Sequence, residues 1–477
     1  MKINHNMAAV ISNAQLLRTE NSLAASVERL SSGLKINRAK DDPAGMAISN
    51  KMQAQIDGLS KASENASNGI SVLQIADSAL GEISSILQRM RELSVQAATD
   101  TNKLEDREAI QQEISSLREE VDRISRDTEY NTKKLLDGTS DTRVYADGVS
   151  RMAISDAVQT GDYKMTINAA ATQAASMTTI STGTIPEGSV VINGMEIFIS
   201  EGEEASSVFE KLRRGAELAD VNLMVVDPGA VQDYDAYPST GGYAPQERAF
   251  EFGDPVAFVS NQYGNSSQVD ITCSNDELAS FLGLDGAVVT AGTDADVELD
   301  LSSAFGPQAT VSTDGNRFKV TDASGFEMEF MTDPGRNGEL GIEVTDIGTM
   351  TLQIGANEHQ TMEVRIPRVS SETLYLDEVD VTKVQGGGKA ITTLDGAIGT
   401  ATSVRSAIGA YQNRLEHAVD SLDASEEDMT NAIARIADVD MAEEMTEYTK
   451  NTVLQQAGTA VLAQANDLPQ SVLQLLQ

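Results

Sequence analysis

The sequence predicts a mainly α-helical protein with a β-rich insert. Both chain ends are expected to form one discontinuous helical coiled-coil and rod domain, and the centre a variable α+β region. Apolar residues recur with heptad spacing towards both ends, whereas strand-like runs and turn dipeptides fill the middle. Aromatic residues make up only 4% of the 477 residues, which suits helical seams of Leu, Ile, Val and Ala. This length allows two to four domains.

The longest apolar pattern runs from about Ser63 to Ala97. A helix of this length extends roughly 50 Å at about 1.5 Å per residue, which is too long for the core of an ordinary compact domain. Another helix must therefore cover its seam. Apolar seam residues alternate in steps of three and four, with Ser94 in the remaining slot: Leu73, Ala76, Leu80, Ile83, Leu87, Met90 and Ala97.

Two shorter helical patterns flank this long one. Asp42 is a good N-cap and Pro43 a good first helical residue, so we expect a helix to start at Pro43 and to fray near Gly58. After a turn at 100–102, a second seam predicts an antiparallel partner helix. The seam before Asp42 consists of Leu23, Val27, Leu30 and Leu34, and the seam after the turn of Ile110, Ile114, Leu117, Val121 and Ile124.

In the middle of the chain, the helical heptad pattern gives way to strand-like runs. Arg143–Ala146 and Tyr163–Ile167 are expected to form a β-hairpin on the rod. In 171–349, one or two compact α+β units are expected, including a hairpin over Ser189–Ile199 with a favoured Asn-Gly turn and a helix at Ala205–Leu218. Residues 171–349 hold 30 acidic and 7 basic residues, a net charge of −23 out of −38 for the whole chain. The negative charge is thus concentrated in this insert.

Helical seams return near the C-terminus. A strand pair near Leu352–Ile366 and a flexible Gly386–Gly388 precede them. Ends this apolar are expected to pair with each other or with other copies of the chain. One seam comprises Ile408, Tyr411, Leu415, Ala418, Leu422, Met429, Ala432 and Ile436, and the last comprises Val461, Ala465, Leu468, Val472 and Leu475.

Composition and motifs argue against several functions. A net charge of −38 disfavours attraction to nucleic acid or anionic membranes, and no run of 18 apolar residues predicts a transmembrane helix. Cys273 is the single cysteine, and the three histidines are too scattered to suggest a metal site. The N-terminus lacks the features of a secretory signal peptide. We find no catalytic motif, and expect no enzyme, metal or cofactor.

Four long motifs lie in the two outer parts of the chain. Glu28–Ser49 reads ERLSSGLKINRAKDDPAGMAIS and Gln88–Gln96 reads QRMRELSVQ. Ala410–Leu415 reads AYQNRL, and Leu454–Leu476 reads LQQAGTAVLAQANDLPQSVLQLL. These motifs resemble those of bacterial flagellin, the filament subunit of the flagellum. The resemblance covers roughly the first 170 and the last 125 residues, and leaves 171–349 unassigned.

The resemblance implies three regions. Residues 1–40 and 440–477 would form an inner coiled-coil domain at the filament core. Residues 41–170 and 350–439 would form a helical rod with a β-hairpin, and 171–349 would face outwards. The terminal assembly helices would use Leu23, Val27, Leu30, Leu34, Val461, Leu468, Val472 and Leu475.

The resemblance also implies a location and partners. The chain would leave the cell unfolded through the flagellar type III system and polymerise with its own kind into the extracellular filament that serves motility. An export chaperone would cover the C-terminal helix, about Ala442–Gln477. Filament cap and hook-junction proteins would be further partners, with no role for nucleic acid or membrane.

A stripe one residue off the long seam is the candidate recognition face. It holds Arg89, Leu93 and Gln96, and we expect Leu93 to be an exposed apolar residue between polar ones, as at interfaces. The resemblance implies that Arg89 and Leu93, with Glu113 of the next helix, contact the toll-like receptor for flagellin. It also implies that this face makes subunit contacts in the filament.

Two alternatives remain open at this stage. A hook–filament junction protein shares the paired terminal helices, but the LQQAGTAVLAQAN ending favours flagellin. A flagellin with an enzymatic insert would be excluded by a purified 171–349 segment without hydrolytic activity or metal binding. We expect the insert to decorate the surface, where its Ser and Thr residues are candidate glycan carriers.

Overall fold

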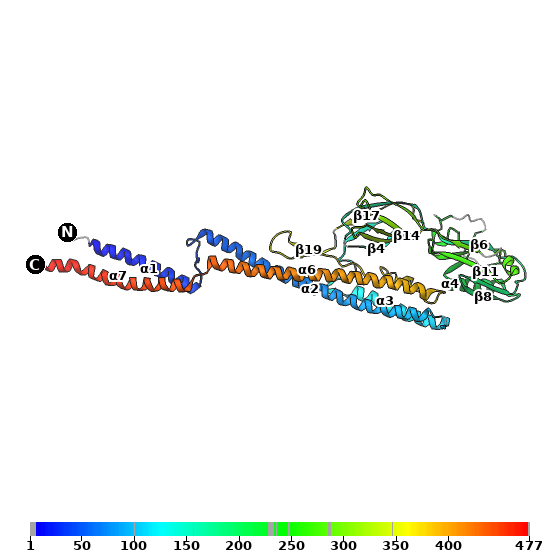
Figure 1. Cartoon of the computed structure of the whole chain (residues 1–477), viewed down its shortest axis with the longest axis horizontal. Helices are drawn as coiled ribbons and strands as arrows, with labels where there is room; N and C mark the ends of the chain where they lie inside the picture. Colours follow the sequence, from blue (N-terminus) through cyan, green and yellow to red (C-terminus); the bar gives the residue numbers. More distant parts are fainter. Residues whose placement is uncertain are drawn as a thin grey trace. The chain divides into compact units, whose positions relative to one another are not determined.

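The computed structural model describes residues 6–99, 101–155, 157–227, 233–234, 236–246, 249–284, 288–345 and 347–475, with backbone only for 468–475. Figure 1 shows helices at both ends of the chain and strands in its middle, as the sequence predicts. The chain divides into two compact units, each assembled from separate stretches of sequence. The first comprises Met1–Ile70, Leu352–Met362 and Asn413–Gln477, and the second Ser71–Thr351 and Glu363–Gln412.

The longer helices carry the predicted pairing of the two halves of the chain. The N-terminal helix α1 pairs with the C-terminal α7, and α2 is bonded to α6 through Ser63–Asp423 in the first unit and Asp77–Arg405 in the second. The helices are α1 (Met7–Ser32), α2 (Pro43–Ala97), α3 (Leu104–Asp127), α4 (Ala205–Leu218), α5 (Asp276–Phe281), α6 (Gly386–Ala437) and α7 (Met441–Leu475).

Helix α2 starts where the sequence predicts, but it is not interrupted. Asp42 Oδ1 accepts hydrogen bonds from the backbone N–H groups of Ala44 at 3.1 Å and Gly45 at 3.0 Å, which caps the helix. The expected fraying near Gly58 is wrong. A Cβ at Gly58 would lie 2.9 Å from the Cβ of Ala356, so this glycine allows the loop after β18 (Met350–Gln353) to approach the helix closely.

The predicted seam of α2 is confirmed as the core of the helical part of the second unit. Leu73, Ala76, Leu80, Ile83, Leu87, Met90, Ser94 and Ala97 are all buried. By length and composition alone α2 could cross a membrane, since one 18-residue window has a mean hydropathy of 1.3. In the structure, 33% of that window is buried. The core helix of a soluble protein meets the same criterion, and here the apolar face of α2 is buried against the protein.

The predicted flexible segment at Gly386–Gly388 is instead the first turn of α6. A Cβ at Gly387 would lie 2.7 Å from the Cα of Ala98, so the missing side chain lets the start of α6 lie against the end of α2. The Leu352–Ile366 strand pair is confirmed as β18 and β19 (Thr361–Val364). A two-stranded sheet also follows α3, formed by β1 (Glu129–Tyr130) and β2 (Lys133–Lys134).

Two β-rich modules with separate cores complete the second unit. The first, here the Phe318 module, contains two four-stranded antiparallel sheets, ordered β13-β5-β17-β3 and β14-β15-β16-β4. Its alternating apolar residues, such as Tyr163, Met165 and Ile167, point into a core shared with Phe318 and Phe330. Its strands are β3 (Arg143–Ala146), β4 (Val149–Ile154), β5 (Gly161–Ala169), β13 (Asp296–Leu299), β14 (Thr310–Asp314), β15 (Arg317–Thr321), β16 (Glu327–Thr332) and β17 (Gly338–Thr345).

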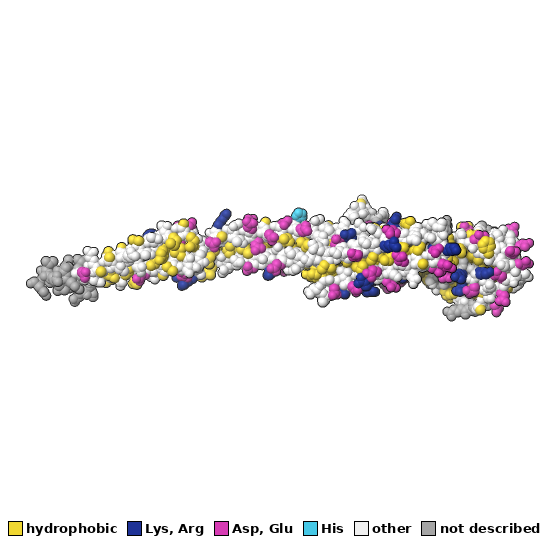
Figure 2. All heavy atoms as spheres, turned by 90° about the horizontal axis from the view of Figure 1, so that it is seen from below, with side chains coloured by type: hydrophobic (Ala, Val, Ile, Leu, Met, Phe, Trp, Pro, Cys, Tyr) yellow, Lys and Arg dark blue, Asp and Glu magenta, His cyan; other side chains and the backbone are white. Residues whose placement is uncertain are grey.

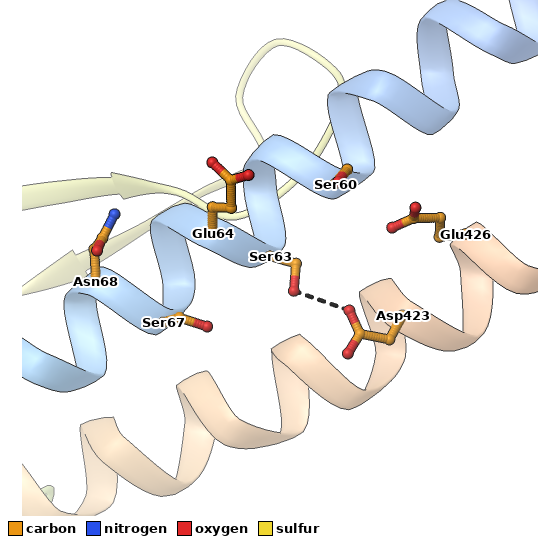
Figure 3. A pocket seen from close by; sticks show the side chains of 7 residues that line it. All are labelled: Ser60, Ser63, Glu64, Ser67, Asn68, Asp423 and Glu426. Carbon is orange, nitrogen blue, oxygen red and sulfur yellow. Dashed lines mark hydrogen bonds between the residues drawn. The ribbon is translucent and has the colours of Figure 1, made fainter.

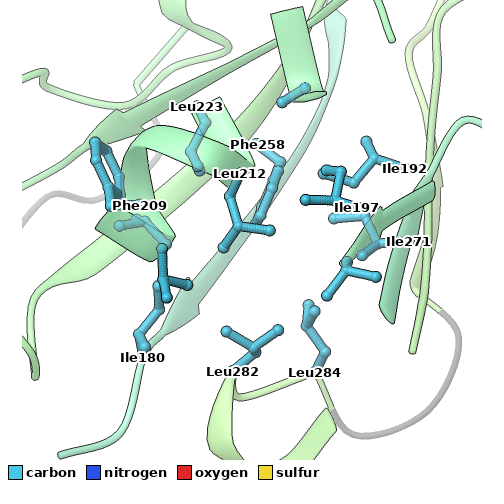
Figure 4. Packing of buried hydrophobic residues seen from close by; sticks show 14 of the residues in the cluster. Ile180, Ile192, Ile197, Phe209, Leu212, Leu223, Phe258, Ile271, Leu282 and Leu284 are labelled. Carbon is cyan, nitrogen blue, oxygen red and sulfur yellow. The ribbon is translucent and has the colours of Figure 1, made fainter. Parts of the chain in front are cut away.

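The second module, here the Phe258 module, is an insertion in the first. Helices α4 and α5 and sheets ordered β6-β10-β9 and β12-β11-β7-β8 enclose a core around Phe258 and Leu212 (Figure 4). The Asn193-Gly194 hairpin and the Ala205–Leu218 helix are confirmed. The strands are β6 (Gln173–Thr179), β7 (Gly188–Ile192), β8 (Met195–Ile199), β9 (Val221–Val225), β10 (Pro255–Tyr263), β11 (Gln268–Cys273) and β12 (Val288–Ala291).

One predicted strand pairing is wrong. Arg143–Ala146 and Gly161–Ala169 are strands, but each pairs with β17 rather than with the other. The strand between them, Gly338–Thr345, comes from much later in the chain. These residues therefore belong to the Phe318 module, and not to a separate hairpin.

Candidate assembly and recognition surfaces

The pairing of α1 with α7 is fixed by polar contacts at three levels. Near the free ends, Asn6 Nδ2 donates to the Ala465 carbonyl at 2.8 Å. Further along, Arg29 Nη1 lies 3.4 Å from Glu444 Oε2, and the Glu444 side chain is only 9% exposed. Beyond α1 and α7, the segment after α1 pairs with the end of α6 through a backbone hydrogen bond from Lys35 N to Ala437 O at 2.6 Å. These contacts set one register.

The seam between these two helices is made of small and polar residues. Thr19 and Ser26 are the buried residues of α1, seven positions apart. Among the α7 side chains that the structure describes, the buried ones are Glu444, Asn451 and Ala465, again separated by multiples of seven. The helices thus pair with heptad spacing. Small seam residues allow a close approach, but they bury little apolar surface.

Large apolar residues of the same helices face outwards instead. Val10 is 59% exposed, Ile11 65%, Val453 58% and Val461 53%. Figure 2 shows apolar side chains as a yellow band along the terminal helices. Such an accumulation is unusual for the free surface of a soluble protein and marks a site for a partner. The other large exposed apolar residues of α1 and α7 are Met7, Leu17, Val27, Met441, Met445 and Leu454.

The predicted register of the terminal seams is partly wrong. Leu23 and Leu30 are half-buried, but Val27 is 48% and Leu34 38% exposed, because Ser26 takes the buried position between them. Val461 is likewise exposed, whereas Ala465 of the same predicted seam is buried. The side chains of Leu468, Val472 and Leu475 lie outside the described residues. Pairing of the chain ends is confirmed, but three of the six predicted seam residues with described side chains are exposed: Val27, Leu34 and Val461.

The second candidate surface lies on α2 and α3. Arg89 donates to Glu113 Oε1 through Nη2 at 2.9 Å and through Nε at 3.1 Å, and to Glu92 at 3.3 Å. The hydrogen bond to Glu113, followed by that to Glu92, raises the pKa of Arg89 above its ordinary value. The structure therefore brings together two predicted site residues, both exposed. Gln96 is also exposed on this side of α2.

The expectation for Leu93 is wrong. Its side chain is 2% exposed, so it belongs to the core and not to the surface. The exposed apolar residue nearby is Val95, at 47%. Helix α2 has two helical neighbours in this unit, α3 and α6, and its buried face is therefore wider than a two-helix seam. A stripe one residue off the seam is covered as a consequence.

A polar groove between α2 and α6 was not predicted. It has a volume of about 400 Å³, and the Ser63 hydroxyl donates to Asp423 Oδ1 at 2.9 Å across it (Figure 3). Its lining consists of hydroxyls, carboxylates and one amide, with no imidazole or thiol to activate a nucleophile. It is lined by Ser60, Ser63, Glu64, Ser67, Asn68, Asp423 and Glu426.

Two side chains with potentially reactive groups are Cys273 and His359. Cys273 is half-buried, and burial raises the pKa of its thiol, which disfavours the nucleophilic thiolate. His359 is 90% exposed and contacts Glu358 at 3.6 Å. Among the residues that the structure describes, no three His, Cys, Asp or Glu side chains are placed to hold a metal ion.

Sequence reasoning missed a group of charged side chains in the second unit. Arg151 and Arg317 meet Tyr375, and Lys383 meets Asp220. No spacing rule connects residues so far apart in sequence. The outward register of Val10, Ile11 and Leu17 was in principle detectable, because these residues do not fit the same heptad positions as Leu23 and Leu30.

Comparison with known proteins gives full-length matches. Residues 3–141 match the family profile "Bacterial flagellin N-terminal helical region", and residues 391–476 match "Bacterial flagellin C-terminal helical region". The flagellin of Clostridium tyrobutyricum is 33% identical over 98% of this chain and 100% of its own length. The B-type flagellin of Pseudomonas aeruginosa is 31% identical, with 100% of both chains covered.

Solved structures give weaker likenesses. The flagellar hook associated protein-3 of Legionella pneumophila has a TM-score of 0.31 at 14% identity, covering 81% of this chain and 98% of that one. FliC of Burkholderia pseudomallei has a TM-score of 0.24 at 15% identity, covering 72% and 99%.

Proposed function

Because the chain belongs to the bacterial flagellins and is thus a subunit of the extracellular flagellar filament, we propose that its terminal helices form the polymer contacts. Full-length likeness to flagellins decides against the hook–filament junction alternative. The flagellins are structural proteins, and we propose no enzymatic role for the central modules. The inner domain would comprise 1–40 with 440–477, the rod 41–170 with 350–439, and the outward region 171–349, with β3, β4 and β5 of the rod stretch packed in the Phe318 module.

One observation carries the proposal. Helices α1 and α7 bury small and polar residues against each other and expose large apolar ones, with Ile11 at 65% and Val453 at 58% exposure. Burying a Val, Leu or Ile side chain fully contributes about 1.5–3 kcal/mol. Contact with helices of neighbouring subunits would supply this burial, whereas the intramolecular pair does not.

The Arg89–Glu113 pair supports a second contact surface. Both side chains are exposed and held by hydrogen bonds, so they offer a fixed charge pattern to a partner. We propose that this surface, with Gln96, is recognised by the toll-like receptor for flagellin and takes part in subunit contacts. Leu93 would support the surface from within the core rather than contact the partner.

Export and the accessory partners extend the same reasoning. We propose that the chain is exported unfolded by the flagellar type III system, which suits a terminal pair with little apolar burial. An export chaperone would cover the apolar residues of about 442–477 until assembly. Filament cap and hook-junction proteins would meet the same terminal helices at the two ends of the filament.

Seeded assembly tests the polymer contact. Purified subunits are mixed with filament fragments, and elongation is followed by light scattering and electron microscopy. Ile11→Asp should reduce elongation strongly, because it places a charge on the outward apolar face. Deleting 440–477 should abolish elongation.

A matched control tests whether a charge at any exposed apolar residue would reduce elongation. Phe198 on β8 is 70% exposed, and the proposal gives it no part in assembly. Phe198→Asp should therefore elongate at the wild-type rate. Normal growth by Ile11→Asp or by the truncated chain would refute terminal-helix assembly.

A further inference from the structure

The chain between β19 and α6 lies along α3. Ser371 donates to both carboxylate oxygens of Asp122, through its N–H at 2.9 Å and its hydroxyl at 2.8 Å. Further on, the Gln111 amide donates to Val379 O at 3.0 Å and accepts from Val381 N at 2.9 Å. The contacts move towards the start of α3 as the chain advances, so this stretch runs antiparallel to the helix.

This stretch, together with the first turn of α6, is called here the 371–389 segment. One side of it belongs to the core: Leu374, Leu376, Val379 and Val381 are all at most 2% exposed. The helical part of the unit therefore holds the segment by apolar burial as well as by hydrogen bonds. Several of its polar and aromatic side chains contact the two β modules.

The Phe318 module meets the segment at Tyr375. The Arg317 guanidinium carbon lies 3.7 Å from the centre of the Tyr375 ring, and that of Arg151 lies 5.1 Å from it. Arg151 also donates to Glu378 at 2.9 Å and to Asp377 at 2.5 Å. Two module cations thus meet an aromatic ring and two carboxylates of the segment.

Tyr375 is held by its ring and not by its hydroxyl. Among the described residues, no hydrogen-bond partner reaches its buried hydroxyl oxygen. Its backbone has φ +55°, in the left-handed region that costs energy for a residue with a Cβ. Stacking between guanidinium groups and the ring is the interaction that offsets this cost.

The Phe258 module meets the same segment at a second point. Asp220, at the turn between α4 and β9, accepts from Lys383 Nζ at 2.8 Å and from Lys389 Nζ at 3.3 Å. The backbone joins the contact through Val384 N, which donates to Leu218 O at 2.8 Å. Burial raises the pKa of Asp220, but the two lysines outweigh it and hold the pKa below its ordinary value.

The two contacts have opposite polarity. At Tyr375 the module supplies cations and the segment supplies carboxylates, whereas at Asp220 the module supplies the carboxylate and the segment the cations. We propose that the charged side chains of the 371–389 segment fix the orientation of both β modules on the helical part of their unit. Any exchange or large rotation of the modules would bring like charges together. This inference is independent of the proposed polymer contacts.

Distances between spin labels in the full chain test whether the 371–389 segment fixes the orientation of the modules. Labels at Ser116→Cys on α3 and Ser206→Cys on α4, in a Cys273→Ser background, report on the Phe258 module. Ser116→Cys with Ser324→Cys reports on the Phe318 module. Each pair should give a single narrow distance distribution in the otherwise unaltered protein.

Variants at each contact should broaden only the matching distribution. Asp220→Asn keeps a residue that tolerates the left-handed backbone at +62° but removes the charge. It should broaden the Ser116–Ser206 distribution, and Tyr375→Ala should broaden the Ser116–Ser324 distribution. Exchanging the charges, as Asp220→Lys with Lys383→Asp in a Lys389→Gln background, should restore the narrow distribution that Asp220→Lys alone loses.

Two variants should leave both distance distributions unchanged. Arg213→Gln removes a charge from α4, where Arg213 pairs with Glu210 at 2.6 Å away from the segment, and should change nothing. Tyr375→Phe should also leave the distances unchanged, because the hydroxyl has no partner. Broad distributions in the unaltered protein, narrow ones in both Asp220→Asn and Tyr375→Ala, or failure of the exchanged pair would each overturn the proposal.

Discussion

The burial of Leu93 can be tested against an exposed neighbour on the same helix. Leu93 is 2% exposed, whereas Val95 is 47% exposed. Truncating a fully buried leucine to alanine costs about 2–5 kcal/mol, because apolar contacts are lost and a cavity remains. Truncating a half-exposed surface residue usually changes stability by less than about 0.5 kcal/mol. Leu93→Ala should therefore destabilise the monomer far more than Val95→Ala.

Urea unfolding of the monomer, followed by circular dichroism at a helical wavelength, measures this difference. With a denaturant slope of about 3 kcal/mol per M, a loss of 3 kcal/mol moves the midpoint by about 1 M. The comparison uses the transition of the helical part, because a protein with several cores need not unfold in one step. Val95→Ala should leave the midpoint within experimental error.

The same pair separates the core from the surface interpretation of Leu93. If Leu93 contacted a receptor or another subunit directly, Leu93→Ala would weaken that binding and leave the midpoint unchanged. That outcome would refute the burial described here. If Leu93 only supports α2, binding should fall in proportion to the loss of helical structure, and Val95→Ala should bind normally.

Two further sets of substitutions test features of the helical part. Exchanging the charges of the exposed pair, as Arg89→Glu with Glu113→Arg, should leave the thermal midpoint of the monomer unchanged but abolish binding to the toll-like receptor, measured by surface plasmon resonance; unchanged binding would remove this pair from the recognition surface. Gly387→Ala should destabilise the protein by at least about 1 kcal/mol, because its Cβ would lie 2.7 Å from the Ala98 Cα. Gly388→Ala, with open space at its Cβ, should instead stabilise it by up to about 1 kcal/mol in the same urea titration, and equal effects at both glycines would contradict the close approach.

Helical seams were predictable from the sequence because their apolar residues recur at a fixed spacing. The seam from Leu73 to Ala97 follows heptad spacing without a break, and each of its positions is buried. The β7–β8 hairpin was predictable for a local reason, since Asn193 and Gly194 have φ of +45° and +86°, which the favoured two-residue turn requires.

Features that depend on distant partners were not predictable. Gly58 looked like a helix break, but its role is set by Ala356, almost 300 residues away. The strand that separates Arg143–Ala146 from Gly161–Ala169 is likewise contributed by residues 338–345. Leu93 was misplaced for the same kind of reason, because heptad spacing describes one neighbouring helix and α2 has two.

The terminal helices show how a misplaced register can still identify an interaction surface. An apolar residue that lies outside the intramolecular seam is exposed in the monomer. Val27 and Val461, which were predicted to lie in the seam, are therefore part of the outward face. Isolated helices are marginal in water, and the buried Thr19, Ser26 and Asn451 contribute little apolar burial to hold this pair together. Covering their outward face would therefore add to the stabilisation of α1 and α7. If neighbouring subunits cover this face as proposed, we expect the terminal helices to be weakly held in the monomer and to become stable on assembly.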